Sequence, residues 1–335
     1  MILVTGGTGL VGAHLLYRLV STHKKVRAIY RNEKKLTKTK QVFAGYTKNS
    51  EALFNTIEWV MADILDISAL DAAFKNVTHV YHCAAFVSFE PDKYHLLRKI
   101  NIEGTANIVN LAMAHQVTKL CYASSVATLG RMLNNAPITE STFWNPEAEN
   151  TVYAITKYGA EMEVWRATQE GLNAVMVNPG VILGAGIWQY GSGSLFKRAH
   201  RGLKYFSSGT VALVAVEDVV AIMIKLMESD IHKERFILVA ENWTYKDFLC
   251  ALAHSVNAKP PKALASKRLL NIAWRLDWLK QKLTGKSRVL TKQLTHAISS
   301  EKNFSSEKVI KALDYNFKPI DSTISQVGQH YLKQE

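Results

Sequence analysis

The sequence predicts an α/β fold: a doubly wound parallel sheet with helices on both faces, followed by a smaller, mainly helical lobe. Three observations support this. Short apolar runs alternate with helical patterns over the first half of the chain, a glycine-rich turn follows the first run, and the pattern is mostly helical from Lys259 onward. With 335 residues, of which 48% are hydrophobic, the chain can bury a sizeable core and is long enough for two lobes.

Each expected strand is a short run rich in β-branched residues, as buried parallel strands are. These runs are Met1–Val4, Val26–Tyr30, Glu58–Met61, His79–His82, Leu120–Ala123 and Ala174–Val177. The segments with helical periodicity between them are Val11–Thr22, Ile67–Asn76, Lys99–His115 and Tyr153–Glu170. Repeated β–α units of this kind predict a parallel sheet with right-handed crossovers.

The remaining segments extend this plan into two bodies. Arg235–Ala240 is expected to return to the sheet as a further strand, and Thr244-x-x-Asp247 to form a capping box that opens a helix. We therefore predict a first domain made of residues 1–178 and 214–240, and a second lobe made of residues 179–213 and 241–335.

Charge and cysteine content exclude several functional classes. The net charge of +13 is local, because Lys259–Lys292 holds ten basic residues and one acidic residue, and no nucleic-acid motif accompanies it, so we expect no nucleic-acid partner. The three cysteines (Cys83, Cys121 and Cys250) lack disulfide or zinc-ligand spacing, so no metal site is expected and a reducing compartment fits. Without a signal-peptide pattern or a plain membrane span, we predict a cytoplasmic protein.

The strongest local motif is the glycine-rich run from Val4 to Gly12, which follows the first expected strand and opens a helix. This is the context in which such a loop binds the pyrophosphate of a dinucleotide. Gly6 or Gly7 would permit the tight turn, Gly9 the approach of backbone to phosphate, and Gly12 the packing of helix against strand. The residues expected to bind the cofactor here are Gly6, Thr8, Gly9, Leu10, Val11 and Gly12.

The end of the second expected strand indicates which dinucleotide is bound. Tyr30 stands where an acidic residue would bind the ribose 2′-hydroxyl of NAD, Arg31 follows it, and Arg27 is nearby. A guanidinium suits a 2′-phosphate, so we predict NADP(H), with NAD(H) as the alternative if Arg31 is only a solvated loop charge.

Tyr153 and Lys157 are four residues apart on one face of an expected helix. A tyrosine needs a nearby cation to act as a general acid–base near neutral pH, because its ordinary pKa is near 10. Ser124 and Ser125 end an expected strand, where a hydroxyl can face a cleft at the carboxyl edge of the sheet. Alone, however, this tyrosine–lysine spacing is common.

Together these motifs resemble the extended short-chain dehydrogenase/reductase family, whose fold is of the Rossmann type. The resemblance covers about 215 residues, in family order. It comprises the Thr5–Gly12 loop, Asp63-Ile64, His82-Cys-Ala-Ala85, Asn101-x-x-Gly104-Thr105, Ser124-Ser125, Tyr153-x-x-x-Lys157, Asn178-Pro179-Gly180 and Val216-Glu217-Asp218-Val219.

The resemblance assigns roles to individual residues. It implies that Tyr153 is the proton donor or acceptor, that Lys157 holds the nicotinamide ribose and depresses the Tyr153 pKa, and that Asn101 supports the site. Ser125 aligns best with the family's catalytic serine, and Ser124 is the alternative. The remaining residues assigned to the cofactor are Asp63 and Ile64 at the adenine, Ala84, Ala85 and Ser124 along the cofactor, and Pro179 and Val181 near the nicotinamide.

Departures from subfamily patterns narrow the expected reaction. Ser125 is followed by Val126-Ala127-Thr128 without the acid that dehydratases carry, and the strand Ala174–Val177 differs from that of nucleotide-sugar epimerases. The run Asn178–Gly184 resembles that of dihydroflavonol reductases and 3β-hydroxysteroid dehydrogenases. This implies NADP-linked interconversion of a carbonyl and a secondary alcohol on a fairly apolar small molecule. The alternatives are a nucleotide-sugar epimerase with tightly held NAD and a non-catalytic cofactor-sensing protein.

The basic C-terminal region contains an amphipathic helix at 268–283. Leu269, Ile272, Ala273, Leu276 and Leu283 form one apolar stripe, which Trp274 and Trp278 widen. We expect this stripe to pack on the core of the second lobe and to close over the substrate, with weak docking to an acidic membrane surface as the alternative. The resemblance also allows a homodimer built by helices across a twofold axis.

Overall fold

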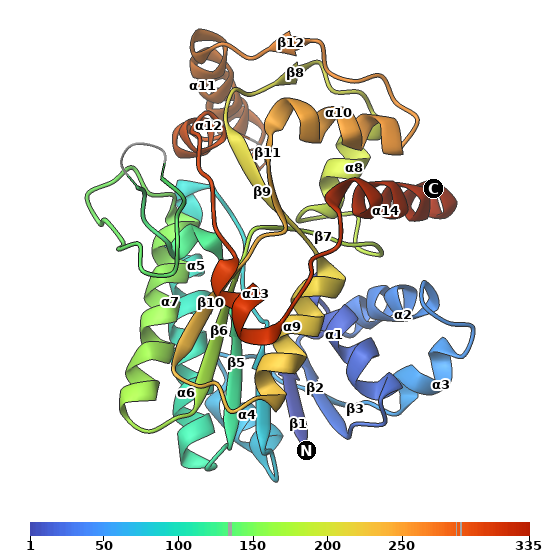
Figure 1. Cartoon of the computed structure of the whole chain (residues 1–335), viewed down its shortest axis with the longest axis vertical. Coiled ribbons are helices and arrows are strands. Elements are labelled where there is room, and N and C mark those ends of the chain that lie inside the picture. The colour runs from blue at the N-terminus through green and yellow to red at the C-terminus, as the bar shows by residue number, and fades with distance from the viewer. Residues whose placement is uncertain (133–135, 286, 289) are drawn as a thin grey trace.

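The computed structural model of the chain describes residues 1–132, 136–285, 287–288 and 290–335. Within these residues, a parallel sheet of seven strands forms the lower body in Figure 1, in the order β10-β6-β5-β4-β1-β2-β3. Its strands are β1 (Ile2–Thr5), β2 (Val26–Tyr30), β3 (Glu58–Met61), β4 (His79–His82), β5 (Lys119–Ala123), β6 (Ala174–Pro179) and β10 (Glu234–Leu238). The predicted fold class is therefore confirmed, and the strand expected at Arg235–Ala240 pairs with β6.

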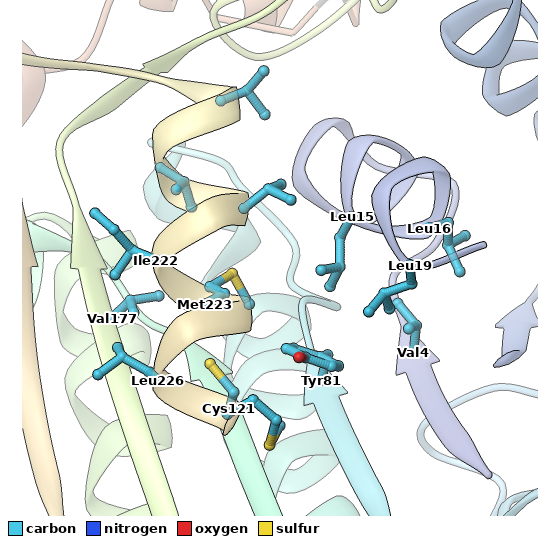
Figure 2. Packing of buried hydrophobic residues seen from close by; sticks show 14 of the residues in the cluster. Val4, Leu15, Leu16, Leu19, Tyr81, Cys121, Val177, Ile222, Met223 and Leu226 are labelled. Atoms are coloured by element: carbon cyan, nitrogen blue, oxygen red, sulfur yellow. The ribbon is translucent and has the colours of Figure 1, made fainter. Parts of the chain in front are cut away.

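Helices cover both faces of this sheet, because each strand alternates its apolar side chains between the two faces. One face carries α1 (Leu10–Ser21), α2 (Leu36–Ala44), α3 (Ser50–Asn55) and α9 (Val216–Glu228). The other face carries α4 (Ile67–Phe74), α6 (Gly104–Ala114) and α7 (Val152–Gln169). Figure 2 shows the first core, where Ile222, Met223 and Leu226 of α9 lie beside α1 and above the strands.

Tight local fits position the ends of these elements. The expected helix over Lys99–His115 begins with a π-helical segment, Lys99–Glu103, that follows the short α5 (Tyr94–Arg98). Gly104 starts α6 where a Cβ would lie 2.5 Å from the end of the Ile64 side chain, so a larger residue would require Ile64 to shift.

The second lobe holds more strand than its sequence indicates. Its sheet, in the order β11-β9-β7, is formed by β7 (Val181–Leu183), β9 (Thr210–Ala215) and β11 (Glu241–Thr244), and a two-residue ribbon pairs β8 (Tyr205–Phe206) with β12 (Ala263–Leu264). Its helices are α8 (Gly193–His200), α10 (Tyr245–Ser255), α11 (Lys267–Thr284), α12 (Lys292–Ile298) and α14 (Ile320–Gln334). Thr244 caps α10 as expected, because its hydroxyl oxygen accepts a hydrogen bond from the Asp247 amide, while the Asp247 carboxylate accepts from the Thr244 hydroxyl.

The chain contacts the first domain again near its C-terminus. Helix α13 (Glu307–Leu313) lies against β10 and α9, where Val309 is fully buried in the core of the large sheet. Tyr315 donates a hydrogen bond to Asp218 of α9. The division of the chain into two bodies stays a prediction, and this packing places α13 on the first of them. In the described part of the chain, no helix is long and apolar enough to cross a membrane.

Candidate active site

The glycine-rich loop has the geometry of an anion-binding turn. Gly6 adopts φ +71°, and a Cβ there would lie 2.6 Å from the backbone of Cys83 and Ala84 in the loop after β4. Gly9 is the N-cap of α1 and supplies no side-chain cap, and the first turn of α1 carries no acidic residue. The amides at the start of α1 are therefore left to a ligand, and the dipole there favours an anion. These residues fit the pyrophosphate of a dinucleotide.

Gly12 has a different role from the one its position in the motif predicts. A Cβ on Gly12 would lie 2.2 Å from the carbonyl oxygen of Gly6 and 2.9 Å from the Cα of Gly7. The close approach is therefore between α1 and the turn itself, rather than between α1 and the strand. Gly12 lets the first turn of the helix close directly over the loop.

A cationic corner lies where β2 and β3 end. The Arg31 guanidinium is half exposed and contacts the Asp63 carboxylate at 3.3 Å, and Asp63 also accepts a hydrogen bond from the Leu65 amide. Burial lowers the pKa of Lys35, and the nearby charges of Arg31 and Lys38 lower it further. Lys35, which was not selected from the sequence, thus adds positive charge near Arg31, and Lys38 adds positive charge near Lys35.

Arg27, expected near this corner, lies elsewhere. Its guanidinium pairs with Glu58 on the neighbouring strand and donates to the carbonyl oxygens of Ala73 and Lys75 at the end of α4. Arg27 lies near the start of β2, whereas Arg31 directly follows its end. Residues four apart face the same side of a strand, so the two side chains differ in their position along the sheet and not in the face they occupy. Arg27 therefore ties the sheet to α4 and leaves the corner to Arg31.

Ser125 and Tyr153 meet at the carboxyl edge of the sheet. Ser125 follows β5, and Tyr153 lies in the first turn of α7, which Thr151 caps by accepting a hydrogen bond from the Ala154 amide. Burial raises the pKa of Tyr153, and a hydrogen bond with the Ser125 side chain opposes this rise. The two hydroxyls can therefore contact one substrate oxygen.

Lys157 is fully buried one turn further along α7. Its ammonium donates to the Tyr122 hydroxyl at 2.6 Å and to the Ala123 carbonyl oxygen at 2.8 Å. Burial lowers the pKa of Lys157 to about 7, and the negative charge of Glu161 partly opposes this shift. Its expected action on the pKa of Tyr153 stays a prediction.

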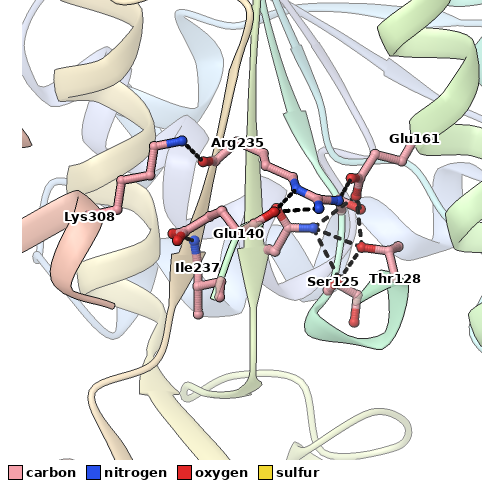
Figure 3. Close-up of polar contacts among 9 residues, drawn as sticks. Ser125, Thr128, Glu140, Glu161, Arg235, Ile237 and Lys308 are labelled. Carbon is pink, nitrogen blue, oxygen red and sulfur yellow. Dashed lines mark hydrogen bonds and ion pairs between the residues drawn. The ribbon is translucent and has the colours of Figure 1, made fainter. Parts of the chain in front are cut away.

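The neighbouring Ser124 is bound into a buried polar network around Glu161, whose bonds to Thr128 and Arg235 can be followed in Figure 3. Its hydroxyl donates to Glu161 at 2.5 Å, and the same carboxylate oxygen accepts from Thr128 at 2.8 Å and from Asn178 at 2.8 Å. The other oxygen of Glu161 pairs with Arg235 of β10 at 2.8 Å. Of the two serines, only Ser125 is thus placed with the tyrosine.

Asn101 lies in the π-helical segment and holds the loop after β4. Its side-chain amide accepts from the Phe86 amide at 2.8 Å, donates to the Phe86 carbonyl oxygen at 3.0 Å, and donates to Thr156 of α7 at 3.2 Å. Asn101 therefore fixes the loop that carries Ala84 and Ala85 relative to the helix of Tyr153. It acts through these elements as a positioning residue.

The other residues assigned from the sequence occupy the same edge of the sheet. Ala84 follows β4 and donates its amide to Thr5 at the end of β1, at 3.2 Å. Ile64 is buried against α6, and Asn107 of α6 donates to its carbonyl oxygen. Pro179 ends β6, and Val181 starts β7.

Four side chains around the site were given no role from the sequence. Tyr122 binds Lys157, and the Phe89 ring lies edge-on to the Tyr153 ring with 5.6 Å between centroids. His82 joins Thr5 and Thr105 through its two ring nitrogens, and burial lowers its pKa to about 3, so it is neutral. Two of the four left a sequence signal: His82 begins the motif that ends at Ala85, and Glu161 repeats the four-residue spacing of the tyrosine and lysine.

Comparisons with known proteins agree with this geometry. A family model described as the NAD dependent epimerase/dehydratase family matches residues 2–239. The chain is 27% identical to "Sterol demethylase protein B" of Methylococcus capsulatus, over 80% of this chain and 78% of that protein. It is 28% identical to a "Putative dihydroflavonol 4-reductase" of Synechocystis sp., over 81% of this chain and 77% of that protein. The crystal structure of gox2253 superposes with a TM-score of 0.80 at 25% identity, covering 100% of this chain and 98% of that one.

Proposed function

Because this chain belongs to the NAD dependent epimerase/dehydratase family, we propose that it catalyses an NADP-linked interconversion of a carbonyl and a secondary alcohol on a fairly apolar small molecule. As a member of this family, the chain is an NAD(P)-dependent enzyme of the extended short-chain dehydrogenase/reductase type. The observation that carries the proposal is the placement of the Ser125 and Tyr153 side chains together at the carboxyl edge of the sheet, one helical turn from the buried ammonium of Lys157.

The proposed mechanism uses the two hydroxyls as a pair. In the direction of reduction, the substrate carbonyl oxygen accepts hydrogen bonds from Ser125 and Tyr153, which stabilise the negative charge that develops on it. Tyr153 then gives its proton to that oxygen. The bound nicotinamide cofactor supplies the hydride in this direction and accepts it in the other. In oxidation, Tyr153 takes the hydroxyl proton from the substrate alcohol.

Lys157 contributes a positive charge at the end of β5 when its amine is protonated. Its ammonium is held by the Tyr122 hydroxyl and the Ala123 carbonyl oxygen, one helical turn from Tyr153. A cation at this position favours the phenolate form of Tyr153 and so eases proton release. Because the pKa of Lys157 is lowered to about 7, this assistance weakens as the pH rises through that value.

The choice of NADP(H) rests on the cationic corner. Arg31 is half exposed, so its guanidinium is accessible to a ligand, and Lys35 lies close enough for the two charges to repel. A 2′-phosphate between them would replace this repulsion by charge-assisted hydrogen bonds. It would also compete with the Asp63 carboxylate for Arg31.

The apolar substrate class is supported by the surroundings of Tyr153 and by the relatives. The Phe89 ring lies beside the tyrosine, and no acidic residue directly follows Ser125 to drive an elimination. The printed names of two relatives refer to a sterol and to a dihydroflavonol, both largely apolar ring systems.

The test is to measure NADPH consumption with a panel of aldehydes, ketones and hydroxysteroids, following the absorbance of the free cofactor. We expect stoichiometric oxidation of NADPH with at least one ketone, and the reverse with the matching alcohol and NADP. An epimerase with tightly held NAD would convert a nucleotide sugar without any change in free NADPH, and this result would contradict the proposal.

A further inference from the structure

Four residues of the predicted stripe of α11, Leu269, Ile272, Leu276 and Leu283, face solvent together with Leu279, and Ala273 is half-buried. The expected packing of the stripe on the lobe core is therefore wrong. The exposed fractions are 36% for Leu269, 56% for Ile272, 61% for Leu276, 47% for Leu279 and 76% for Leu283. The buried side of the helix is narrow and centres on Leu270, which is 8% exposed. Exposed apolar residues that form one continuous stripe mark an interaction surface more strongly than scattered ones.

The five exposed residues lie on one face because their spacing alternates between three and four along the helix. Basic residues border this face on both sides: Arg268, Arg275 and Lys282 on one side and Lys280 on the other, all exposed. Together with Lys267, they give α11 five basic residues against one acidic residue, Asp277. Asp277 lies on the opposite side, where it accepts a hydrogen bond from the Leu290 amide.

The basic residues beside the leucine stripe indicate which partner this surface binds. Pairing of the stripe with a second copy of the chain would place Arg275 or Lys282 beside basic residues of the other helix in either orientation, and like charges at these flanking positions oppose pairing. An anionic bilayer instead offers hydrocarbon to the leucines and phosphate to the flanking lysines and arginines, whose stems can reach the headgroups.

The location of the helix fits a surface contact. Figure 1 shows α11 at the end of the molecule opposite the N-terminus. Its C-terminal part is held against the turn at Pro91–Lys93, since Gln281 of the helix donates to Asp92, and Arg288, which follows the helix, pairs with Asp92 at 3.0 Å. This turn begins two residues after Phe89, whose ring contacts Tyr153.

We propose that the exposed face of α11 docks this protein on an anionic lipid bilayer, with the leucine stripe in the interface and the flanking basic side chains on the headgroups. Binding is peripheral and electrostatically assisted, so it weakens with salt. The inference concerns the surface alone and holds whatever reaction the active site performs.

The experiment is co-sedimentation of the full chain with vesicles of equal parts phosphatidylcholine and phosphatidylglycerol, compared with pure phosphatidylcholine, at low and high salt. We expect binding only to the anionic vesicles and its loss at high salt. The double variant Lys280→Glu/Lys282→Glu should lower the partition coefficient by at least about tenfold, because each basic residue near an anionic surface contributes on the order of 1 kcal/mol. Leu276→Ser/Leu283→Ser should also weaken binding at unchanged charge.

Matched controls separate the surface from general effects. Lys48→Glu/Lys333→Glu makes the same change of net charge elsewhere, and Phe143→Ser/Ile310→Ser removes two other exposed apolar side chains. Both controls should bind like the parent protein, and circular dichroism should be unchanged for all variants. Equal binding by the α11 variants and the parent, or no binding to anionic vesicles, would overturn the proposal. So would a dimer in analytical ultracentrifugation that Leu276→Ser/Leu283→Ser dissociates while vesicles fail to bind.

Discussion

At the scale of single residues, two adjacent serines have separate tasks. The Ser125 side chain lies with that of Tyr153, whereas Ser124 donates to Glu161. The sequence identifies the pair as a candidate but does not decide between its members, because the decision depends on which way each side chain faces. Neighbouring residues at the end of a strand face opposite sides, so only one of them can reach the tyrosine.

Replacement of each serine by alanine therefore has different consequences. Ser125→Ala removes one donor to the substrate oxygen and should lower kcat about 100-fold or more, with the Kd of NADPH unchanged. Ser124→Ala is the matched control, and it should retain most of the activity because Thr128, Asn178 and Arg235 still bind Glu161. Steady-state kinetics and cofactor titration decide this, and an inactive Ser124→Ala with an active Ser125→Ala would reverse the assignment.

Arg31 is expected to select the phosphorylated cofactor. Arg31→Ala removes a cation that would bind the 2′-phosphate. Because a hydrogen bond to a charged group contributes about 1.5–3 kcal/mol, the Kd of NADPH should rise by about tenfold or more. The Kd of NADH should change little, which makes NADH the internal control. Fluorescence titrations of the parent and the variant measure both constants. Equal affinities for NADPH and NADH in the parent would refute the preference.

At the scale of elements, periodicity predicts which residues share a face but not what that face contacts. The parallel strands were predictable because apolar runs of this length are buried on both faces. Helix α11 was also predictable as a helix, yet its stripe faces solvent. The short strands β7, β9 and β11 could not be predicted, since their pairing joins segments about 30 residues apart, and local sequence does not encode such pairing.

Helix α7 joins the catalytic pair to a buried ion pair. Glu161 is fully buried and binds Arg235, which is 17% exposed, so loss of its charge leaves the guanidinium without its partner. Glu161→Gln should lower the free energy of unfolding by about 3 kcal/mol. Glu163→Gln on the same helix alters a partly exposed pair with Arg166 and should cost less than about 1 kcal/mol. Urea unfolding of both variants tests this, and equal losses would contradict the role of the buried pair.

At the scale of the whole molecule, the cofactor motifs and the excess basic charge lie in different parts of the fold. The cofactor half positions glycine loop, serine, tyrosine and lysine at one edge of the sheet, and these were predictable because each motif lies at the end of a predicted strand or in a predicted helix. The basic region includes α11, at the opposite end from the N-terminus. The return of α13 to the large sheet was not predictable, because Val309 sits in a short helix whose partners are distant in sequence.

The most direct test of the central claim is the replacement Tyr153→Phe, which removes one hydroxyl and keeps the ring that contacts Phe89. With any substrate found to oxidise NADPH, the variant should lose turnover by about 100-fold or more, because the proton donor is gone. Its Kd for NADPH and its unfolding free energy should stay close to those of the parent. Turnover at the parental rate in Tyr153→Phe would contradict the account, since another group would then supply the proton.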